Sequence, residues 1–340
     1  MVTTRVPQHC ACFLLLSYFS YVLFLIFNRP DTTKKVFDII RQVKPSKLFI
    51  ASDGAREGNS NDERLCKQAR NITEQVDWEC DVKYLYRDKN LGCRIAISSG
   101  IDWFFEYVDE GIILEDDCLP SKSFFWFCQE LLEKYRDNHQ IMQINGSFYL
   151  DGLMDFKSSY YYSKLISCWG WATWKDSWRH FDIKIPEYSK LKQEGFIENY
   201  YENNEITEWM QNYLDEVKMD SSGIWSTQWA FSIIKCNGLS ISPTTNLVKN
   251  IGFFRGTSAS EGFELYMEFD VAEIDDINAL NHPSRILYNK KIDALHFDTI
   301  IKSTDPRLNM NFINHFVNTI KSIIKFILPQ SVVLFLKKYK

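Results

Sequence analysis

Gly111-Ile112-Ile113-Leu114-Glu115-Asp116-Asp117 is the stretch of the sequence that most restricts its fold. A short apolar run that leads straight into polar residues is typical of a buried strand that ends at the rim of a sheet. Three adjacent carboxylates repel one another unless positive charge lies between them. We therefore interpret the stretch as a strand that delivers three acids to a ligand site, and not as a solvated acidic turn. The helix that Ser121 is expected to cap supports this interpretation.

Strands and helices alternate around this stretch. Strands are expected over 22–27, 47–51, 82–86, 111–114 and 141–144, and helices over 31–43, 62–75, 94–106 and 122–135, the first capped by Asp31. Beyond them, the sequence indicates an antiparallel strand over 160–162, an aromatic loop over 168–174 that enters a helix, helices over 207–218 and 225–235, and a strand over 239–242. The alternation predicts an α/β fold with a mostly parallel central sheet. No long linker divides the chain, so we expect one main domain over 20–306.

Composition and charge narrow the class of protein. The chain has 340 residues, 45% hydrophobic and 24% charged, which is ordinary for a globular protein. The net charge of −5 argues against a nucleic-acid-binding protein, which normally carries a basic surface. Nine cysteines are scattered without a CxxC pair, so we expect free thiols in a reducing compartment and no zinc ribbon.

The N-terminal segment 10–27 is nearly all apolar and uncharged. Such a run is long enough to span a membrane, and it is also compatible with a signal segment or a buried strand. Its second half leads directly into Asn28-Arg29-Pro30 and a helix. We therefore expect a buried first strand in a cytoplasmic protein, with residues 1–19 as an extension, and keep a signal-anchored membrane protein as the alternative.

Polar residues follow each of the first strands. Asn28-Arg29 follow the first, Asp53 the second and the segment Asn90–Arg94 the third. Because ligands of α/β sheets bind beyond the carboxyl ends of the strands, we expect these residues to converge with the acids. Asp53 is suited to hydrogen-bond a base or ribose, and Arg29 and Arg94 are suited to a diphosphate.

Continued extended geometry would place Glu115 and Asp117 on one face of the strand and Asp116 on the other. One face could then hold a divalent cation while the other takes ribose hydroxyls. Mg²⁺ and Mn²⁺ favour one or two carboxylates together with substrate phosphates.

These segments, with Cys168-Trp169-Gly170-Trp171-Ala172-Thr173-Trp174 and the stretch 229–252, resemble the GT-A glycosyltransferases. The resemblance is to family 2-like bacterial sugar transferases of the haemolytic-protein-like kind, related to N-acetylglucosaminyltransferase I, and it covers residues 20–260. It implies a GT-A fold, a nucleotide-diphosphate sugar donor and a glycan or lipid-linked acceptor, in the synthesis of polysaccharide, lipopolysaccharide or other glycans. It also implies transfer of a hexosyl or N-acetylhexosaminyl group.

The resemblance also implies roles for individual residues. Asp117 would coordinate Mn²⁺ or Mg²⁺, Asp116 would contact the ribose, and Glu115 would support the base or its loop. The nucleotide pocket would be lined by Phe27, Asn28, Arg29 and Asp53. Trp169, Gly170 and Trp171 would lie where the donor sugar meets the acceptor, with Trp225 on the same side.

The implied reaction is a single displacement with inversion, in which a carboxylate deprotonates the acceptor hydroxyl. Related enzymes carry this base before a Trp on a late helix, but the matching stretch 223–229 has no acid. Asp220 is the nearest acid upstream and is the candidate base, and Glu261 is a second candidate downstream. A catalytically impaired protein that binds sugars or nucleotide sugars on the same fold is the alternative. A nucleotidyltransferase is a further one, but it normally needs a Gly-rich basic loop after the first strand.

Residues 307–340 carry six Lys or Arg and no acid. Phe312, Phe316, Ile320 and Ile324 fall on one helical face, whereas Lys321 and Lys325 do not. A basic amphipathic helix suits the surface of an anionic membrane. We therefore expect a peripheral membrane contact through this tail, with a helix docked on the main domain as the alternative.

Deleting 307–340 is expected to move the protein from the membrane pellet to the supernatant, because the tail supplies both the apolar face and the basic charge. Fractionation of cells that express the full chain and the truncated chain measures this. Unchanged partitioning would contradict the membrane contact.

Overall fold

The computed structural model describes residues 21–219, 223–252, 264–274, 280–305 and 308. The expected extension 1–19, the candidate bases Asp220 and Glu261 and the expected tail helix lie outside these described residues. Within them, no helix has the length and apolar character needed to cross a membrane.

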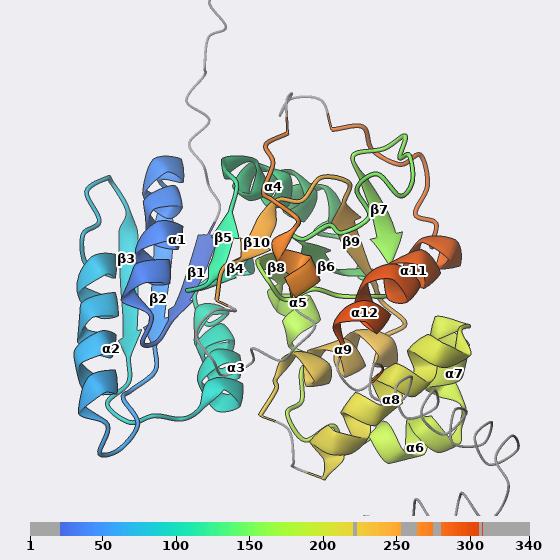
Figure 1. Ribbon diagram of the computed structural model, residues 1–340, viewed down its shortest axis with the longest axis horizontal. Coiled ribbons are helices and arrows are strands. Elements are labelled where there is room, and N and C mark those ends of the chain that lie inside the picture. The colour runs from blue at the N-terminus through green and yellow to red at the C-terminus, as the bar shows by residue number, and fades with distance from the viewer. Residues whose placement is uncertain (1–20, 220–222, 253–263, 275–279, 306–307, 309–340) are drawn as a thin grey trace, which may run out of the picture.

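The central sheet of the described chain has eight strands: β1 Tyr21–Ile26, β2 Lys47–Ser52, β3 Asp81–Tyr86, β4 Glu110–Glu115, β6 Ile141–Asn145, β7 Tyr160–Ser163, β8 Trp171–Trp174 and β9 Leu239–Pro243. Their order is β3-β2-β1-β4-β8-β6-β9-β7 (Figure 1). The strands β3, β2, β1 and β4 are parallel to one another, as are β6 and β9. In contrast, β8 and β7 are antiparallel to their neighbours. The fold is therefore mixed α/β with a mostly parallel central sheet, as predicted.

Twelve α-helices and one π-helical turn are described: α1 Pro30–Val43, α2 Ser60–Thr73, α3 Cys93–Phe104, α4 Lys122–Tyr135, α5 Lys175–Trp178, α6 Tyr188–Gln193, α7 Phe196–Tyr201, α8 Asn204–Lys218, α9 Ser226–Lys235, α10 Glu264–Met267, α11 Lys290–His296, α12 Lys302–Thr304 and the turn Phe297–Ile301. A small second sheet pairs β5 (Cys118–Pro120) with β10 (Val248–Asn250) in antiparallel orientation.

Helices cover both faces of the central sheet (Figure 1). In β1, Val22 and Phe24 face a core built with α1, α2 and α4, whereas Leu23 and Leu25 face a core built with α3, α5 and α9. Successive side chains of a strand point to opposite faces, so a strand covered on both sides must be apolar throughout. This explains why the first strand reads as a continuous apolar run.

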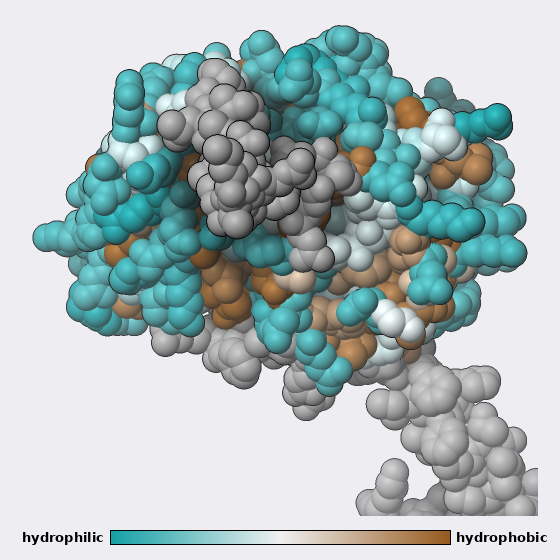
Figure 2. All heavy atoms as spheres, turned by 90° about the horizontal axis from the view of Figure 1, so that it is seen from above, coloured by the Kyte–Doolittle hydropathy of each residue, from teal (hydrophilic) through white to brown (hydrophobic). Residues whose placement is uncertain are grey.

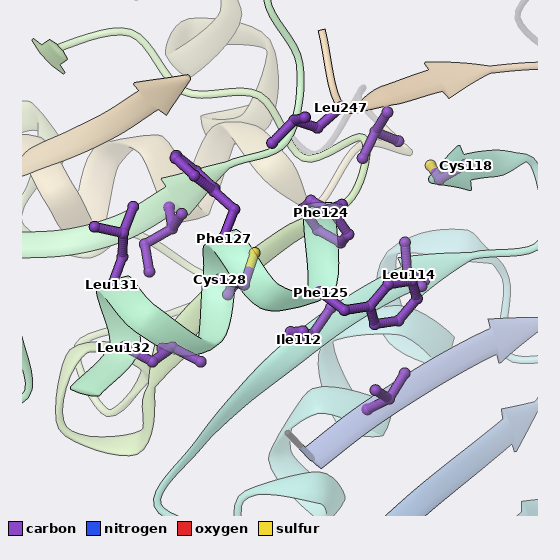
Figure 3. Close-up of a cluster of buried hydrophobic side chains, with 14 of the residues drawn as sticks. Ile112, Leu114, Cys118, Phe124, Phe125, Phe127, Cys128, Leu131, Leu132 and Leu247 are labelled. Atoms are coloured by element: carbon purple, nitrogen blue, oxygen red, sulfur yellow. The ribbon is translucent and has the colours of Figure 1, made fainter. Parts of the chain in front are cut away.

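Helix α4 shows how the core positions the acids. Its buried side chains Phe124, Phe125 and Phe127 pack with Ile112 and Leu114 of β4, the strand that leads into the acids (Figure 3). Ser121 caps the helix as predicted, because its hydroxyl accepts a hydrogen bond from the Phe124 N–H at 3.2 Å. The end of β4 is therefore held from behind by a fully buried aromatic layer.

The described surface is mainly hydrophilic when seen from above, with hydrophobic side chains visible in patches toward the lower part of the view (Figure 2). Large hydrophobic side chains that are strongly exposed include Met219, at 71%, and Leu287, at 72%. Most apolar side chains of the described chain are instead buried, in a core on each face of the sheet and in a third core among helices α6 to α9.

Two local predictions were wrong. Asp31 does not cap α1, because the helix already begins at Pro30 and Arg29 is its N-cap. Proline suits the first helical position, where its missing N–H has no partner to lose. The expected aromatic loop over 168–174 is in part a strand: β8 pairs with both β4 and β6, and all four of its residues are buried.

Glu273 ties the chain beyond β10 to the start of α4. Its carboxylate accepts hydrogen bonds from the backbone N–H groups of Lys122, at 3.0 Å, and Ser123, at 2.8 Å. Burial alone would raise the pKa of Glu273, but the hydrogen bonds from Ser123 and Lys122 outweigh burial and lower it. The carboxylate thus stabilises the amino end of α4, where negative charge is favoured.

Glu273→Ala is expected to lower the free energy of unfolding by about 1–2 kcal/mol, as for the loss of a helix cap. Urea unfolding at pH 7 measures this, with the exposed Glu268→Ala as the control. Because the folded-state pKa of Glu273 is lowered, its contribution is present above the unfolded pKa and is lost as pH falls through the folded pKa. A difference between wild type and Glu273→Ala that does not shrink in acid would contradict this account.

Candidate functional site

The site lies where the sheet changes direction. From β1 the chain adds β2 and β3 on one side, whereas β4 pairs with the other side of β1. Such a switch point leaves a crevice beyond the carboxyl ends of the two central strands, where α/β proteins bind ligands. Leu25 near the end of β1 is in register with Glu115 at the end of β4. The residues that follow β1 therefore meet the acids, as predicted.

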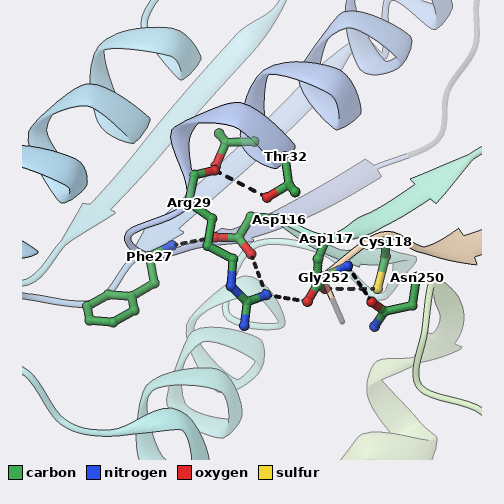
Figure 4. A network of polar contacts seen from close by, with 9 residues as sticks. Phe27, Arg29, Thr32, Asp116, Asp117, Cys118, Asn250 and Gly252 are labelled. Atoms are coloured by element: carbon green, nitrogen blue, oxygen red, sulfur yellow. Dashed lines mark hydrogen bonds and ion pairs between the residues drawn. The ribbon is translucent and has the colours of Figure 1, made fainter. Parts of the chain in front are cut away.

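The side chains of Glu115, Asp116 and Asp117 do not point to alternate faces of the strand as the sequence suggested. Glu115 is the last residue of β4, and Asp116 and Asp117 form a turn before β5. Because the extended geometry ends at Glu115, Asp116 and Asp117 both reach Arg29 instead of pointing to opposite faces (Figure 4). Nη1 of Arg29 lies 3.4 Å from Oδ1 of Asp116 and also bonds Oδ2 of Asp117. The Phe27 N–H donates to the other oxygen of Asp116 at 3.0 Å.

Negative charge is in excess at this site. Asp116 and Asp117 are buried, with 5% and 9% of their surface exposed. Burial, followed by the charges of Asp117 and Asp116, raises the pKa of Glu115, and burial with the charge of Asp117 raises that of Asp116. Burial opposes the charge on Arg29, but Asp116 and Asp117 outweigh it and raise its pKa. Among the described residues, the Arg29 guanidinium bonds two buried carboxylates and a third, Glu115, adds to the negative charge near it, an arrangement that favours a further cation.

The end of β10 closes another side of Asp117. The Ile251 N–H donates to the Asp117 carbonyl oxygen at 2.8 Å, and Gly252 follows directly. A Cβ atom on Gly252 would lie 2.8 Å from Cβ and Cγ of Asp117 and closer still to Oδ2. Glycine is therefore required at 252 if the carboxylate is to keep this position. Figure 4 shows Gly252 and Arg29 on either side of Asp117.

Asn28 takes part in a neighbouring ion-pair cluster that the sequence did not reveal. Its amide donates to Oδ1 of Asp62 at 2.8 Å, and Nη2 of Arg56 donates to the same oxygen at 2.9 Å. The hydrogen bond from Arg56 is the main cause that lowers the pKa of Asp62 to about 2. The Arg56 guanidinium lies 5.9 Å from the centre of the Phe27 ring. Arg56 and Asp62 thus hold Phe27 and Asn28 in place, and no sequence motif marks them.

Asp53, which follows β2, holds the loop that follows β3 by hydrogen bonds. Its carboxylate accepts hydrogen bonds from the N–H groups of Leu91, at 3.0 and 3.1 Å, and Gly92, at 3.1 Å, and from the Asn90 amide at 3.0 Å. These donors occupy both carboxylate oxygens. The expected contact of Asp53 with a base or ribose stays a prediction, whereas its role in shaping the 90–92 loop is shown.

That loop delivers the amino end of α3 to the same rim. Gly92, at φ +77°, is the N-cap of this 12-residue helix and supplies no side-chain cap. The Cys93 side chain is exposed, and its pKa is raised by partial desolvation and then by the charge of Glu115, so the first residue of the helix lies near the acids. Arg94 follows in the first turn. N–H groups without a side-chain cap, together with the helix dipole, favour an anion here.

The predicted aromatic residues separate into two groups. Trp169 is half-buried and packs edge-on against Tyr266, with ring centres 4.9 Å apart. Trp171 is 0% exposed and stacks on Trp225, with ring centres 5.7 Å apart. Trp171 and Trp225 therefore offer no open ring face to a sugar and support the site from the core. Gly170, at φ +67°, lies against Val248, so a side chain there would collide with β10.

The described residues fit a divalent cation only in part. They include no group of three or more His, Cys, Asp or Glu side chains placed to hold a metal ion. Asp117, with Asp116 beside it, offers the one or two carboxylates that Mg²⁺ or Mn²⁺ uses when substrate phosphates supply further ligands. The donor set thus suits a cation that binds together with a phosphate ligand.

Comparisons with protein-family models and with curated proteins give no match. Solved structures with partial similarity include HddC from Yersinia pseudotuberculosis, at 9% identity over 46% of this chain and 77% of that one, with a TM-score of 0.28. A197 from STIV has 13% identity over 49% and 70%, with a TM-score of 0.26. Mouse xyloside xylosyltransferase 1, in its apo form, has 11% identity over 74% and 94%, with a TM-score of 0.35. At such scores the function rests on the site itself, and membership of the GT-A glycosyltransferases stays an expectation of the sequence.

Asp53→Ala is expected to lower the free energy of unfolding by about 1–3 kcal/mol, because the Leu91 and Gly92 N–H groups lose their acceptor. Hydrogen exchange at these two amides should accelerate more than at amides of β2. Asp88→Ala, an exposed acid in the same loop, is the control. Unchanged exchange at Leu91 and Gly92 would refute this role of Asp53.

Proposed function

We propose that this protein is a metal-dependent glycosyltransferase that moves a sugar from a nucleotide-diphosphate sugar to a hydroxyl of a glycan or lipid-linked acceptor. The observation that carries the proposal is the pair of buried carboxylates Asp116 and Asp117 bonded to the Arg29 guanidinium, with Glu115 directly before them, at the switch point between β1 and β4. Buried carboxylates in excess are costly unless a ligand brings positive charge to them.

The rim offers positive groups that suit the phosphates of a diphosphate and carboxylates that suit a cation bound with it. The amino end of α3, with Arg94 in its first turn, and the guanidinium of Arg29 favour the phosphate charge. Asp117 is the residue that would hold Mn²⁺ or Mg²⁺, and Asp116 beside it would contact the ribose. Such a cation, when bound, would neutralise the charge of the departing diphosphate. The protein's own contribution is to keep these groups in place through β4, α4 and β10.

The nucleoside is proposed to lie toward the loops that follow β1 and β2. The Phe27 ring points away from the acids (Figure 4), and Arg56 lies against it. The backbone of Phe27 is bonded to Asp116, so the ring and the acid cluster are fixed relative to each other. This coupling suits a ligand whose base and diphosphate must be held at a set separation.

We propose that the acceptor binds near Trp169, which is half-buried, whereas Trp171 and Trp225 are buried. Aromatic rings suit the apolar face of a pyranose. We propose inversion by direct displacement, with Asp220 as general base, and transfer of a hexosyl or N-acetylhexosaminyl group. A role in polysaccharide or lipopolysaccharide synthesis, at a membrane surface reached through 307–340, completes the proposal.

Asp117→Ala is expected to weaken metal-dependent donor binding by about 100-fold or more, because even residues that only support metal ligands are worth about 10–100-fold. Thermal-shift titrations with UDP-, GDP- and dTDP-sugars, with and without Mn²⁺, measure this. Asp137→Ala, an exposed acid beyond the end of α4, is the control.

The screen separates the proposal from its rivals. Absence of stabilisation by every donor, or equal stabilisation of wild type and Asp117→Ala, would count against it. A donor that binds but is never consumed with any acceptor would instead indicate the catalytically impaired sugar-binding protein, which the lack of an acid in 223–229 favours.

A further inference from the structure

The carboxylate of Asp117 has neighbours on several sides. Oδ2 bonds the Arg29 guanidinium, and on another side of the carboxylate Gly252 lies too close for even a methyl group. Oδ1 lies 3.7 Å from Sγ of Cys118. Among these described neighbours, Arg29 is the one that reaches Asp117 through a long, partly exposed side chain, whereas Gly252 follows the end of β10 and Cys118 belongs to β5 (Figure 4). An approaching cation therefore competes with Arg29.

Arg29 itself is held in a way that allows an exchange of partners. Its backbone is fixed as the N-cap of α1, where its carbonyl oxygen accepts from the Thr33 hydroxyl at 2.7 Å. Its side chain is 27% exposed and reaches Asp117 and Asp116 through one nitrogen, Nη1. A guanidinium carries five N–H donors, so donors remain for a phosphate. A diphosphate at the amino end of α3 would thus compete with Asp117 for Arg29.

We propose that Arg29 is a displaceable counter-ion of Asp117, and that a divalent cation gains this carboxylate only when a nucleoside diphosphate draws Arg29 away. The proposal rests on the proposed function. The exchange keeps Asp117 and Arg29 paired at each stage: Arg29 with Asp117 before binding, and Arg29 with phosphate and the cation with Asp117 after it. Cation and nucleotide must then strengthen each other's binding by the same factor.

Gly252 is the positioning residue of this exchange. A side chain at 252 would displace the Asp117 carboxylate from its position beside β10. The carboxylate could then no longer exchange the Arg29 guanidinium for a cation. Gly223 provides a matched comparison, since a Cβ atom there meets nothing within 4 Å and its φ is not positive. Gly252→Ala and Gly223→Ala therefore differ in their effect on Asp117 and not in the chemical change.

The experiment measures Mn²⁺ affinity by the electron paramagnetic resonance signal of free Mn²⁺, on the full chain, alone and with UDP, GDP or dTDP. In wild type, the matching nucleotide is expected to tighten Mn²⁺ binding by about 5–150-fold, the usual range of coupling between sites. Arg29→Gln is expected to bind Mn²⁺ more tightly than wild type without nucleotide and to lose most of the enhancement. Arg64→Gln, an exposed arginine on α2, should behave as wild type.

Gly252→Ala should weaken Mn²⁺ binding in both conditions, whereas Gly223→Ala should not. The inference is overturned if wild type binds Mn²⁺ equally well with and without all three nucleotides. It is also overturned if Arg29→Gln binds Mn²⁺ alone no better than wild type. If Arg29→Gln does not fold, Arg29→Lys takes its place, because lysine keeps the charge but lacks the planar fork of donors, and it is likewise expected to lose most of the enhancement. Mn²⁺ and nucleotide binding that survive Asp117→Ala would instead refute the proposed function itself.

Discussion

The structure depends on balancing buried negative charge at the junction of β1 and β4. Asp116 and Asp117 are almost fully buried, and the Arg29 guanidinium bonds both. An unpaired buried charge would be far more costly than any local distortion of the chain. Several other features meet this requirement: Arg29 lies at the start of α1, β1 pairs with β4, and Gly252, two residues beyond β10, leaves room for the Asp117 carboxylate.

Much of the architecture follows from local sequence. The apolar runs and the helical periodicity predict the strands and helices of the first 145 residues, because burial on both faces leaves a strong pattern. Ser121 as a helix cap and the antiparallel strand over 160–162 are also confirmed. The convergence of the β1 and β4 ends is predictable as well, since parallel strands bring their carboxyl ends to one edge of the sheet.

Side-chain partners are much less predictable than strands. Asp53 resembles a ligand-binding acid, yet its oxygens bond the chain about 38 residues ahead, a pairing that no local pattern encodes. Trp171 lies in a motif rich in Gly and Trp, but it belongs to β8, which pairs with β4 on one side and with β6 on the other. Asp116 and Asp117 share Arg29 because β4 ends at Glu115, two residues earlier than alternation through Asp117 would require. These outcomes are set by tertiary packing.

The place of β8 in the sheet also bears on how the chain acquires its structure during synthesis. The four parallel strands β1 to β4 can assemble once about the first 120 residues are available. The outer edge of β4 then has unpaired backbone groups and apolar side chains until β8, some 55 residues later, pairs with it. A bare hydrophobic strand edge is a template for wrong pairing between chains. Aggregation is therefore best avoided when residues 171–174 follow quickly enough to pair with β4 before another chain does.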